Sequence, residues 1–133
     1  MERLILGYGT YPQWYAGAPE LDGVMIDWRS LPGGPLRNFR RGFTAVHEIG
    51  HWMGLLHTFE NGCDPPGDEV DDTPAEAYPT KGCPARKDTC PGPGSDPIHN
   101  FMDYSKDTCM REFTRGQAER MARMWQEYRA IAP

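Results

Sequence analysis

Three histidines, His47, His51 and His57, lie in one short stretch that also contains a carboxylate and a glycine. If the stretch is helical, His47 and His51 lie on one face, with Cβ atoms about 5–6 Å apart, and can share one metal ion. Glu48 would lie beside the ion and hold a water there. Gly54 permits a positive φ, so the chain can leave the helix and bring in His57. Three ligands leave one open position, which is typical of a catalytic zinc site.

The order His-Glu-x-x-His-x-x-Gly-x-x-His resembles the signature of the metzincin metallopeptidases, which also have a methionine turn farther along the chain. Met102 and Tyr104 lie in such a segment, Asn-Phe-Met-Asp-Tyr. From about Gly23 to Tyr128 the sequence resembles the pappalysin/cytophagalysin family of secreted metzincins. The resemblance implies an α+β, zincin-like fold with a small mixed sheet, an active-site helix, a long disulfide-stapled loop, a methionine turn and a C-terminal helix.

The same resemblance implies a zinc-dependent endopeptidase that hydrolyses peptide bonds in proteins or peptides. The three histidines would bind Zn²⁺, and Glu48 would be the general base toward a zinc-bound water. Tyr104 is similar to the family tyrosine whose phenol stabilises the oxyanion. Met102 would form an apolar floor beneath the histidines. The alternative is that Tyr104 is an ordinary core residue with no role in the reaction.

Two other functions stay open: a catalytically inert binding module or fragment stabilised by zinc and calcium, and a zinc hydrolase of a non-peptide amide or ester. Glu48 argues against the module, because a structural site gains nothing from a carboxylate beside an open position. His99 is a further candidate ligand, although hydrogen bonding within the methionine turn is the better expectation. Asn100 and Asp103 are expected to fix that turn through side-chain to backbone bonds.

The 133-residue chain is long enough for one domain, and we expect residues 1–133 to form a single metzincin-type catalytic domain, shortened at its N-terminus. The net charge of −5 and the lack of a basic patch argue against nucleic-acid partners. The apolar runs are too short to cross a bilayer. Residues 1–6 show no signal-peptide pattern, but the resemblance implies a secreted, extracellular protein with protein or peptide substrates.

The four cysteines, Cys63, Cys83, Cys90 and Cys109, contain no Cys-x-x-Cys pair, so a second, structural zinc site is not expected. Their even number favours two disulfides in an oxidising compartment, with four reduced cysteines as the alternative. Spacing alone leaves all three pairings open. The family resemblance implies Cys63 with Cys90 and Cys83 with Cys109.

Residues 59–100 are rich in proline and lack a sustained period, which predicts a long loop. Five of its carboxylates cluster at Asp64, Asp68, Glu69, Asp71 and Asp72. Such oxygens are the ligands that Ca²⁺ prefers, and the resemblance implies a structural Ca²⁺ at Asp68, Val70 and Thr73. A solvated acidic loop is the alternative, because the regular ligand spacing of an EF-hand is absent.

Strands are predicted at Leu4 to Tyr8 and at Gly23 to Arg29. In the second, Val24, Ile26 and Trp28 alternate with other residues, so one face should be buried. In metzincins a strand at this point borders the cleft and pairs with extended substrate. We therefore expect Gly23 to Arg29 to do so, with an ordinary interior strand as the alternative.

The active-site helix should begin near Arg41 to Thr44 and end at about Leu55. Four apolar residues should bury it on nearly all sides, at Phe43, Val46, Ile49 and Met53. Thr114 and Gln117 fit a capping box that starts a second helix. One apolar stripe of this helix should pack in the core, at Ala118, Met121, Trp125 and Tyr128.

The segment Tyr104 to Met110 should line the pocket for the residue that follows the cleaved bond. Asp107 could attract Arg or Lys there, although its neighbour Thr108 is neutral. These residues predict a weak preference for basic or polar side chains.

Overall fold

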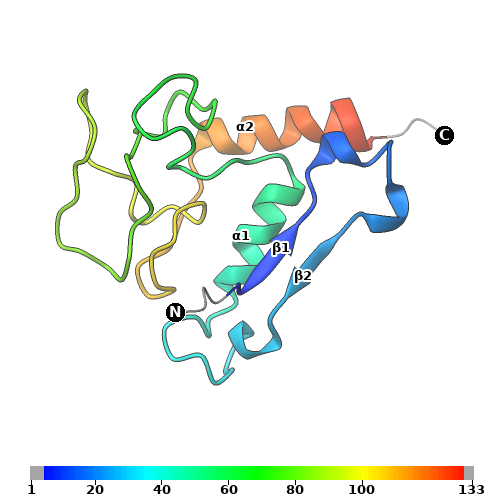
Figure 1. Cartoon of the computed structure of the whole chain (residues 1–133), viewed down its shortest axis with the longest axis horizontal. Helices are drawn as coiled ribbons and strands as arrows, with labels where there is room; N and C mark the ends of the chain where they lie inside the picture. Colours follow the sequence, from blue (N-terminus) through cyan, green and yellow to red (C-terminus); the bar gives the residue numbers. More distant parts are fainter. Residues whose placement is uncertain (1–4, 131–133) are drawn as a thin grey trace.

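The computed structural model describes residues 5–130. Two short strands, β1 (Gly7–Gly9) and β2 (Val24–Ile26), precede helix α1 (Phe43–Trp52), and helix α2 (Arg115–Met124) follows a long irregular segment. The last helix continues as a π turn at Trp125–Arg129. In Figure 1, α1 lies between the two strands and the irregular segment, and α2 lies across the top.

The strands pair antiparallel, with Tyr8 opposite Met25. Strand β2 lies inside its predicted range but is shorter, whereas β1 shares only Gly7 and Tyr8 with its prediction and extends to Gly9. The predicted start at Leu4 lies outside the described residues. The Asp27 side chain accepts the Arg29 N–H (3.0 Å) and starts a 3₁₀ turn, so β2 ends at Ile26. The predicted alternation holds within β2, where Val24 and Ile26 are half-buried and Met25 is exposed, but it does not extend to Trp28, which this turn leaves 68% exposed.

Glycines let β1 lie directly against α1. A Cβ atom on Gly7 would fall 2.8 Å from Cγ of Glu48, and one on Gly9 would fall 2.6 Å from the main-chain oxygen of Glu48. Atoms this close would force strand and helix apart, so only glycine permits the approach. The strand beside Glu48 is therefore β1.

Helix α1 begins within the predicted range and ends before the predicted Leu55. Gly54 adopts a φ of 105° just beyond it, which turns the chain away from the helix axis. Ile49 is 48% exposed, so the prediction that apolar residues bury the helix on nearly all sides is wrong. The buried positions carry small or polar residues instead, at Thr44, His47, Glu48, Gly50 and His51.

Helix α2 begins with the predicted capping box: Gln117 N–H donates to Thr114 Oγ1 (3.1 Å), and Gln117 Oε1 accepts the Thr114 N–H (2.9 Å). The predicted apolar stripe is wrong, because Ala118, Trp125 and Tyr128 are exposed. The buried positions are Gln117, Met124 and Arg129. Gln117 turns inward to exchange two hydrogen bonds with Asn100 (2.8 and 2.9 Å), and this pairing sets the buried face.

The interior contains more polar than apolar side chains. Within residues 5–130 the buried apolar side chains include Pro12, Leu55, Ile98, Met102, Cys109, Met110 and Met124. Disulfides join Cys63 to Cys90 and Cys83 to Cys109, the pairing that the family resemblance implies. None of the helices in the described part of the chain is long and apolar enough to cross a membrane.

A buried ion pair ties the ends of both helices to the loop before β2. Asp22 Oδ2 accepts hydrogen bonds from Arg129 Nη1 (2.7 Å) and from Trp52 Nε1 (3.0 Å), and Oδ1 accepts one from Thr10 Oγ1 (2.9 Å). The Arg129 guanidinium lies 4.0 Å from the Trp52 ring centroid. The hydrogen bond from Arg129 holds the pKa of Asp22 below its usual value.

Replacing Asp22 with Asn should lower the free energy of unfolding by about 3 kcal/mol at neutral pH, because Arg129 would stay buried without its carboxylate. A lowered pKa means that the stabilisation is present above the ordinary value of 3.8 and is lost as the pH falls through the lowered value. The difference in unfolding free energy between the wild type and Asp22→Asn, measured with urea, should therefore be constant from about pH 5 to about pH 8 and become smaller in more acidic buffer. An equal loss in the exposed control Glu20→Gln would contradict this.

Candidate active site

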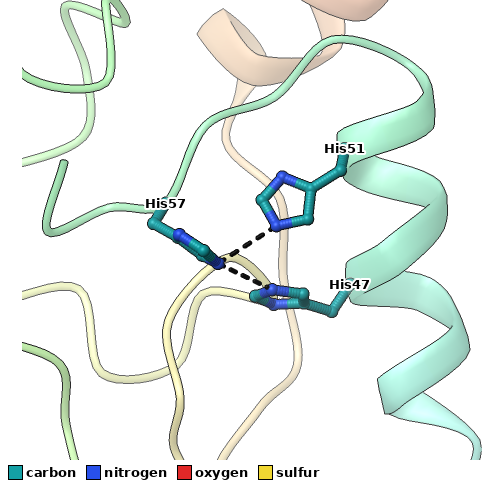
Figure 2. Close-up of side chains that lie close together, drawn as sticks. All are labelled: His47, His51 and His57. Atoms are coloured by element: carbon teal, nitrogen blue, oxygen red, sulfur yellow. Dashed lines mark hydrogen bonds between the residues drawn. The ribbon is translucent and has the colours of Figure 1, made fainter. Parts of the chain in front are cut away.

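The side chains of His47, His51 and His57 converge on one point (Figure 2). His57 Nε2 lies 3.0 Å from Nε2 of His51 and 3.2 Å from Nε2 of His47. A tetrahedral zinc ion at about 2.0–2.1 Å from each nitrogen would space its ligands by about 3.3 Å. The observed separations are within a few tenths of an ångström of that spacing, so the three nitrogens fit one such ion.

Main-chain carbonyls orient two of these imidazoles. Nδ1 of His47 lies 2.6 Å from the Phe101 oxygen, and Nδ1 of His51 lies 2.7 Å from the Leu55 oxygen. A carbonyl only accepts, so Nδ1 carries the proton and the Nε2 lone pair faces the centre. Burial, helped by the nearby His51, lowers the pKa of His47 to about 4, and burial also lowers the pKa of His51. Both rings are therefore neutral near pH 7, the form that binds metals.

Gly54 and Phe59 position the third histidine. The positive φ of Gly54 lets the chain turn back, and any Cβ there would collide with Met124 of α2. The His57 ring stacks on Phe59 with centroids 4.6 Å apart and planes 11° apart. The next residue, Thr58, donates its N–H to the Met102 oxygen (3.2 Å), which ties this loop to the methionine turn.

The methionine turn lies under α1. Met102 is fully buried, and its sulfur fills the space that a side chain on Gly50 would occupy. Asn100 Oδ1 accepts the Met102 N–H (2.9 Å), and Asp103 Oδ1 accepts the Tyr104 N–H (2.7 Å), the kind of contact predicted for these two residues.

Tyr104 lies beside the three histidines. Its ring centroid is 5.0 Å from that of His57 and 5.7 Å from that of His47. His99 is not part of the cluster, and its Nδ1 bonds to the Cys109 oxygen (2.7 Å).

Glu48 borders an open pocket of about 450 Å³. Burial raises the pKa of its carboxyl to about 7. The pocket is lined by Ile5, Leu6, Gly7, Phe39, Phe43, Thr44, His47, Glu48, Asp103, Tyr104, Ser105 and Met110. The site thus combines a metal-binding cluster, a carboxylate that can exchange a proton near neutral pH, and space for a side chain.

Residues 34–126 match the model of the M43 peptidase family, described as pregnancy-associated plasma protein-A. The chain belongs to this family. It is 52% identical over 136 residues to an extracellular metalloprotease of Neurospora crassa, a match that covers 96% of this chain and 46% of that protein. It is 55% identical over 128 residues to extracellular metalloprotease 1 of Coccidioides posadasii, with 94% and 46% covered.

Solved structures of mirolysin show the same fold. Mature mirolysin of Tannerella forsythia, in complex with a cleaved peptide, matches with a TM-score of 0.82 at 35% identity, over 94% of this chain and 49% of that chain. The match confirms the predicted zincin-like, metzincin-type fold. The chain spans about half the length of the relatives it matches.

The strand that borders the pocket was predicted wrongly. Ile5, Leu6 and Gly7 line the pocket, whereas none of the described residues of β2 does. Strand β1 lies against Glu48 because its glycines have no side chains. The alternation of side chains in Gly23 to Arg29 gives no information about which strand contacts the helix.

Asp107 does not supply the pocket with charge. It is 3% exposed, and its carboxylate accepts the N–H groups of Arg41 (2.9 Å) and Phe43, at the start of α1. Burial raises its pKa despite these bonds. Of the predicted segment Tyr104 to Met110, only Tyr104, Ser105 and Met110 line the pocket. The prediction that Asp107 attracts a basic side chain is wrong, because this carboxylate caps the helix.

A buried polar network holds the loop of His57 and the turn of Tyr104. Glu76 has no exposed surface, and it accepts hydrogen bonds from Thr58 Oγ1 (2.6 Å) and Lys87 Nζ (2.9 Å). Thr80, whose hydroxyl also reaches Glu76 (3.3 Å), donates its N–H to Asp103 Oδ1 (2.9 Å). The network therefore contacts the neighbours of both His57 and Tyr104.

This network and two aromatic contacts were not predicted from the sequence. Tyr11 OH lies 3.3 Å from Nδ1 of His51, and Phe59 stacks on His57. The only local signal is the position of Phe59 two residues after the third histidine. Glu76 and Lys87 stand in an acidic and proline-rich segment where nothing local marks them as buried.

The predicted calcium residues come together in one turn. Asp68 accepts hydrogen bonds from Val70 N–H (3.1 Å) and from Thr73 Oγ1 (2.5 Å), and the Thr73 hydroxyl also lies 3.0 Å from the Val70 oxygen. Asp68 is 8% exposed, and burial raises its pKa.

Replacing Lys87 with Met should leave Glu76 buried without its cation and lower the free energy of unfolding by about 3 kcal/mol. Hydrogen exchange should also accelerate at the amides of Thr58 and Thr80, because both segments lose their common anchor. The exposed Lys81 provides the control variant Lys81→Met. Unchanged exchange at both amides would show that the network does not hold the two loops.

Proposed function

We propose that residues 1–133 belong to one catalytic domain of a secreted zinc endopeptidase, which hydrolyses peptide bonds in proteins or peptides. The observation that carries the proposal is the convergence of three histidine Nε2 atoms beside Glu48 at an open pocket. Membership of a metallopeptidase family supports it. Relatives that are named extracellular metalloproteases support secretion.

His47, His51 and His57 would hold Zn²⁺. Bound there, zinc supplies Lewis-acid chemistry, since it polarises a peptide carbonyl and lowers the pKa of water. The carbonyl contacts of His47 and His51 keep the rings aimed without reorganisation.

Glu48 is assigned as the general base. Its carboxylate borders the pocket next to His47, where it can take a proton from the attacking water and return it to the leaving nitrogen. Tyr104 is assigned as a hydrogen-bond donor to the oxyanion, because its ring lies against His47 and His57 at the pocket.

Substrate would add to the open edge of β1. Asp27 N–H donates to the Leu6 oxygen (2.7 Å), and Thr10 N–H donates to the Gly23 oxygen (3.1 Å). The main-chain N–H and C=O groups of the even-numbered residues in and next to β1 therefore point toward β2. By antiparallel alternation, the N–H and C=O groups of Gly7 and Gly9 point to the opposite edge. An extended peptide can pair there and pass its scissile bond beside Glu48.

Replacing Glu48 with Gln should lower kcat for cleavage of casein or a quenched fluorescent peptide by about 10²–10⁴-fold, because the general base is lost. Zinc content, measured by atomic absorption, should stay at one ion per chain. A chelator should abolish wild-type cleavage. The control variant Glu127→Gln, which changes an exposed acid in the π turn after α2, should keep it.

In the same assay, Tyr104→Phe keeps the ring contacts and should lower kcat by about 10²-fold with little change in KM. The exposed Tyr78 provides the control Tyr78→Phe. Intact zinc with no wild-type cleavage would instead identify a noncatalytic binding module.

We further infer that Asp68, Val70 and Thr73 bind a structural Ca²⁺. The buried Asp68 carboxylate, the Val70 carbonyl and the Thr73 oxygens lie in one turn and are the hard donors that Ca²⁺ prefers. The turn also leads to Asp72, which accepts the N–H of Gly116 (2.9 Å) in the first turn of α2. Calcium there would stabilise the loop where it contacts α2.

Calcium added to the zinc-saturated, calcium-depleted chain should therefore raise the free energy of unfolding by about 3 kcal/mol at 100 times its dissociation constant. Urea unfolding with and without calcium measures the effect. Asp68→Asn should remove it, and Asp64→Asn, an exposed acid of the same loop, should not. Equal stability with and without calcium would refute the site.

A further inference from the structure

We infer that Arg120 of α2 is a positioning residue for two of the zinc ligands, because its guanidinium holds the turn at Gly54 that follows α1. The inference rests on the zinc site proposed above, and it concerns a side chain that acts on this site without binding the metal.

The turn after α1 is bonded to both helices through one peptide unit, the one that joins Gly54 to Leu55. The N–H of this unit belongs to Leu55 and donates to the Gly50 oxygen in α1 (2.9 Å). Its carbonyl belongs to Gly54 and accepts a hydrogen bond from Nε of Arg120 in α2 (2.9 Å). Both polar groups of the peptide are therefore bonded, one to each helix, and its plane is fixed.

Two of the three histidines depend on the direction of this peptide. The next carbonyl along the chain, that of Leu55, lies 2.7 Å from Nδ1 of His51 and orients its ring. The chain then runs from Leu55 to His57 in two residues. A rotation of the Gly54 peptide would move the oxygen that orients His51 and redirect the segment that brings in His57. Arg120 therefore acts on both ligands through the backbone.

The Arg120 side chain is itself held in place. It is only 11% exposed, and its Nη2 lies 3.3 Å from Oε2 of Glu69. Met124 lies four residues further, on the same face of α2, and a Cβ atom on Gly54 would fall 2.7 Å from its Cγ. Helix α2 thus contacts the Gly54 turn twice, through a charged donor and through a packed side chain.

Zinc affinity separates a positioning role from a purely structural one. A residue that only ties α2 to the rest of the chain would change the stability of the fold and leave the zinc affinity of the folded chain unchanged. A residue that orients the ligands would weaken zinc binding in the folded chain, because the rings would have to be ordered when the metal binds. Partners that orient metal ligands typically contribute 10–100-fold to affinity.

Arg120→Met keeps an apolar stem of similar length and removes the donors. Its dissociation constant for zinc, measured by competition with a chromophoric chelator on a chain that circular dichroism shows to be folded, should rise about tenfold. The visible absorption bands of the cobalt-substituted chain should also change, because they report the arrangement of the ligands around the metal.

Two further variants serve as controls. Arg123→Met changes an exposed arginine of the same helix and should keep the wild-type zinc affinity and cobalt bands. Arg120→Lys keeps the charge but lacks the planar fork that reaches both Gly54 and Glu69, so its zinc affinity should fall between those of the wild type and Arg120→Met.

Equal zinc affinity and identical cobalt bands in the wild type and folded Arg120→Met would overturn the inference, as would an equal loss in Arg123→Met. If Arg120→Met does not fold, Arg120→Lys decides: weaker zinc binding supports the inference, and wild-type affinity overturns it. These measurements need no substrate. A zinc-binding wild type that cleaves no peptide, together with a weakened Arg120→Met, would refute the peptidase function and support the role of Arg120. A wild type that binds no zinc would overturn both.

Discussion

The orientation of the histidines depends on main-chain carbonyls of irregular segments. Phe101 and Leu55 supply the oxygens that fix His47 and His51, and neither residue belongs to a helix or strand. The orientation of the two imidazole rings therefore depends on how firmly the backbone of these two segments is held. Irregular backbone can be buried only if its polar groups are bonded, and this requirement explains why the interior is largely polar.

The polar interior also connects the two segments to each other. Thr58 bonds to Met102 through the main chain and to Glu76 through its hydroxyl, while Thr80 joins Glu76 to Asp103. Asn100 orders the methionine turn and pairs with Gln117 of α2. Glycines at 9 and 50 then let β1 and Met102 approach α1 at its main chain. Hydrogen bonds thus fix the conformation of the loops, and the two glycines allow β1 and the methionine turn to lie close to α1.

Sequence alone predicted the features that depend on short spacings. His47 and His51 share a helix face, Gly54 leaves the helix, and Thr114 with Gln117 forms a capping box, all within a few residues. The features it missed depend on partners far along the chain. Arg41 and Asp107 are 66 residues apart, and the buried face of α2 follows from a bond between Gln117 and Asn100. Local periodicity contains no information about such partners. Trp28 was missed for a local reason, because the Asp27 side chain starts a turn that ends the alternation.

Asp107 is bonded at the start of α1 and does not line the pocket. The residue before α1 is Gly42, which has no side chain to cap the first turn. The early N–H groups of the helix still need an acceptor, and Asp107 meets this need from the segment after the methionine turn. A carboxylate bonded in this way also favours the positive end of the helix dipole. A carboxylate held in this way is not free to pair with a basic group, so the interaction that stabilises the helix presenting His47 and His51 also keeps Asp107 out of the pocket.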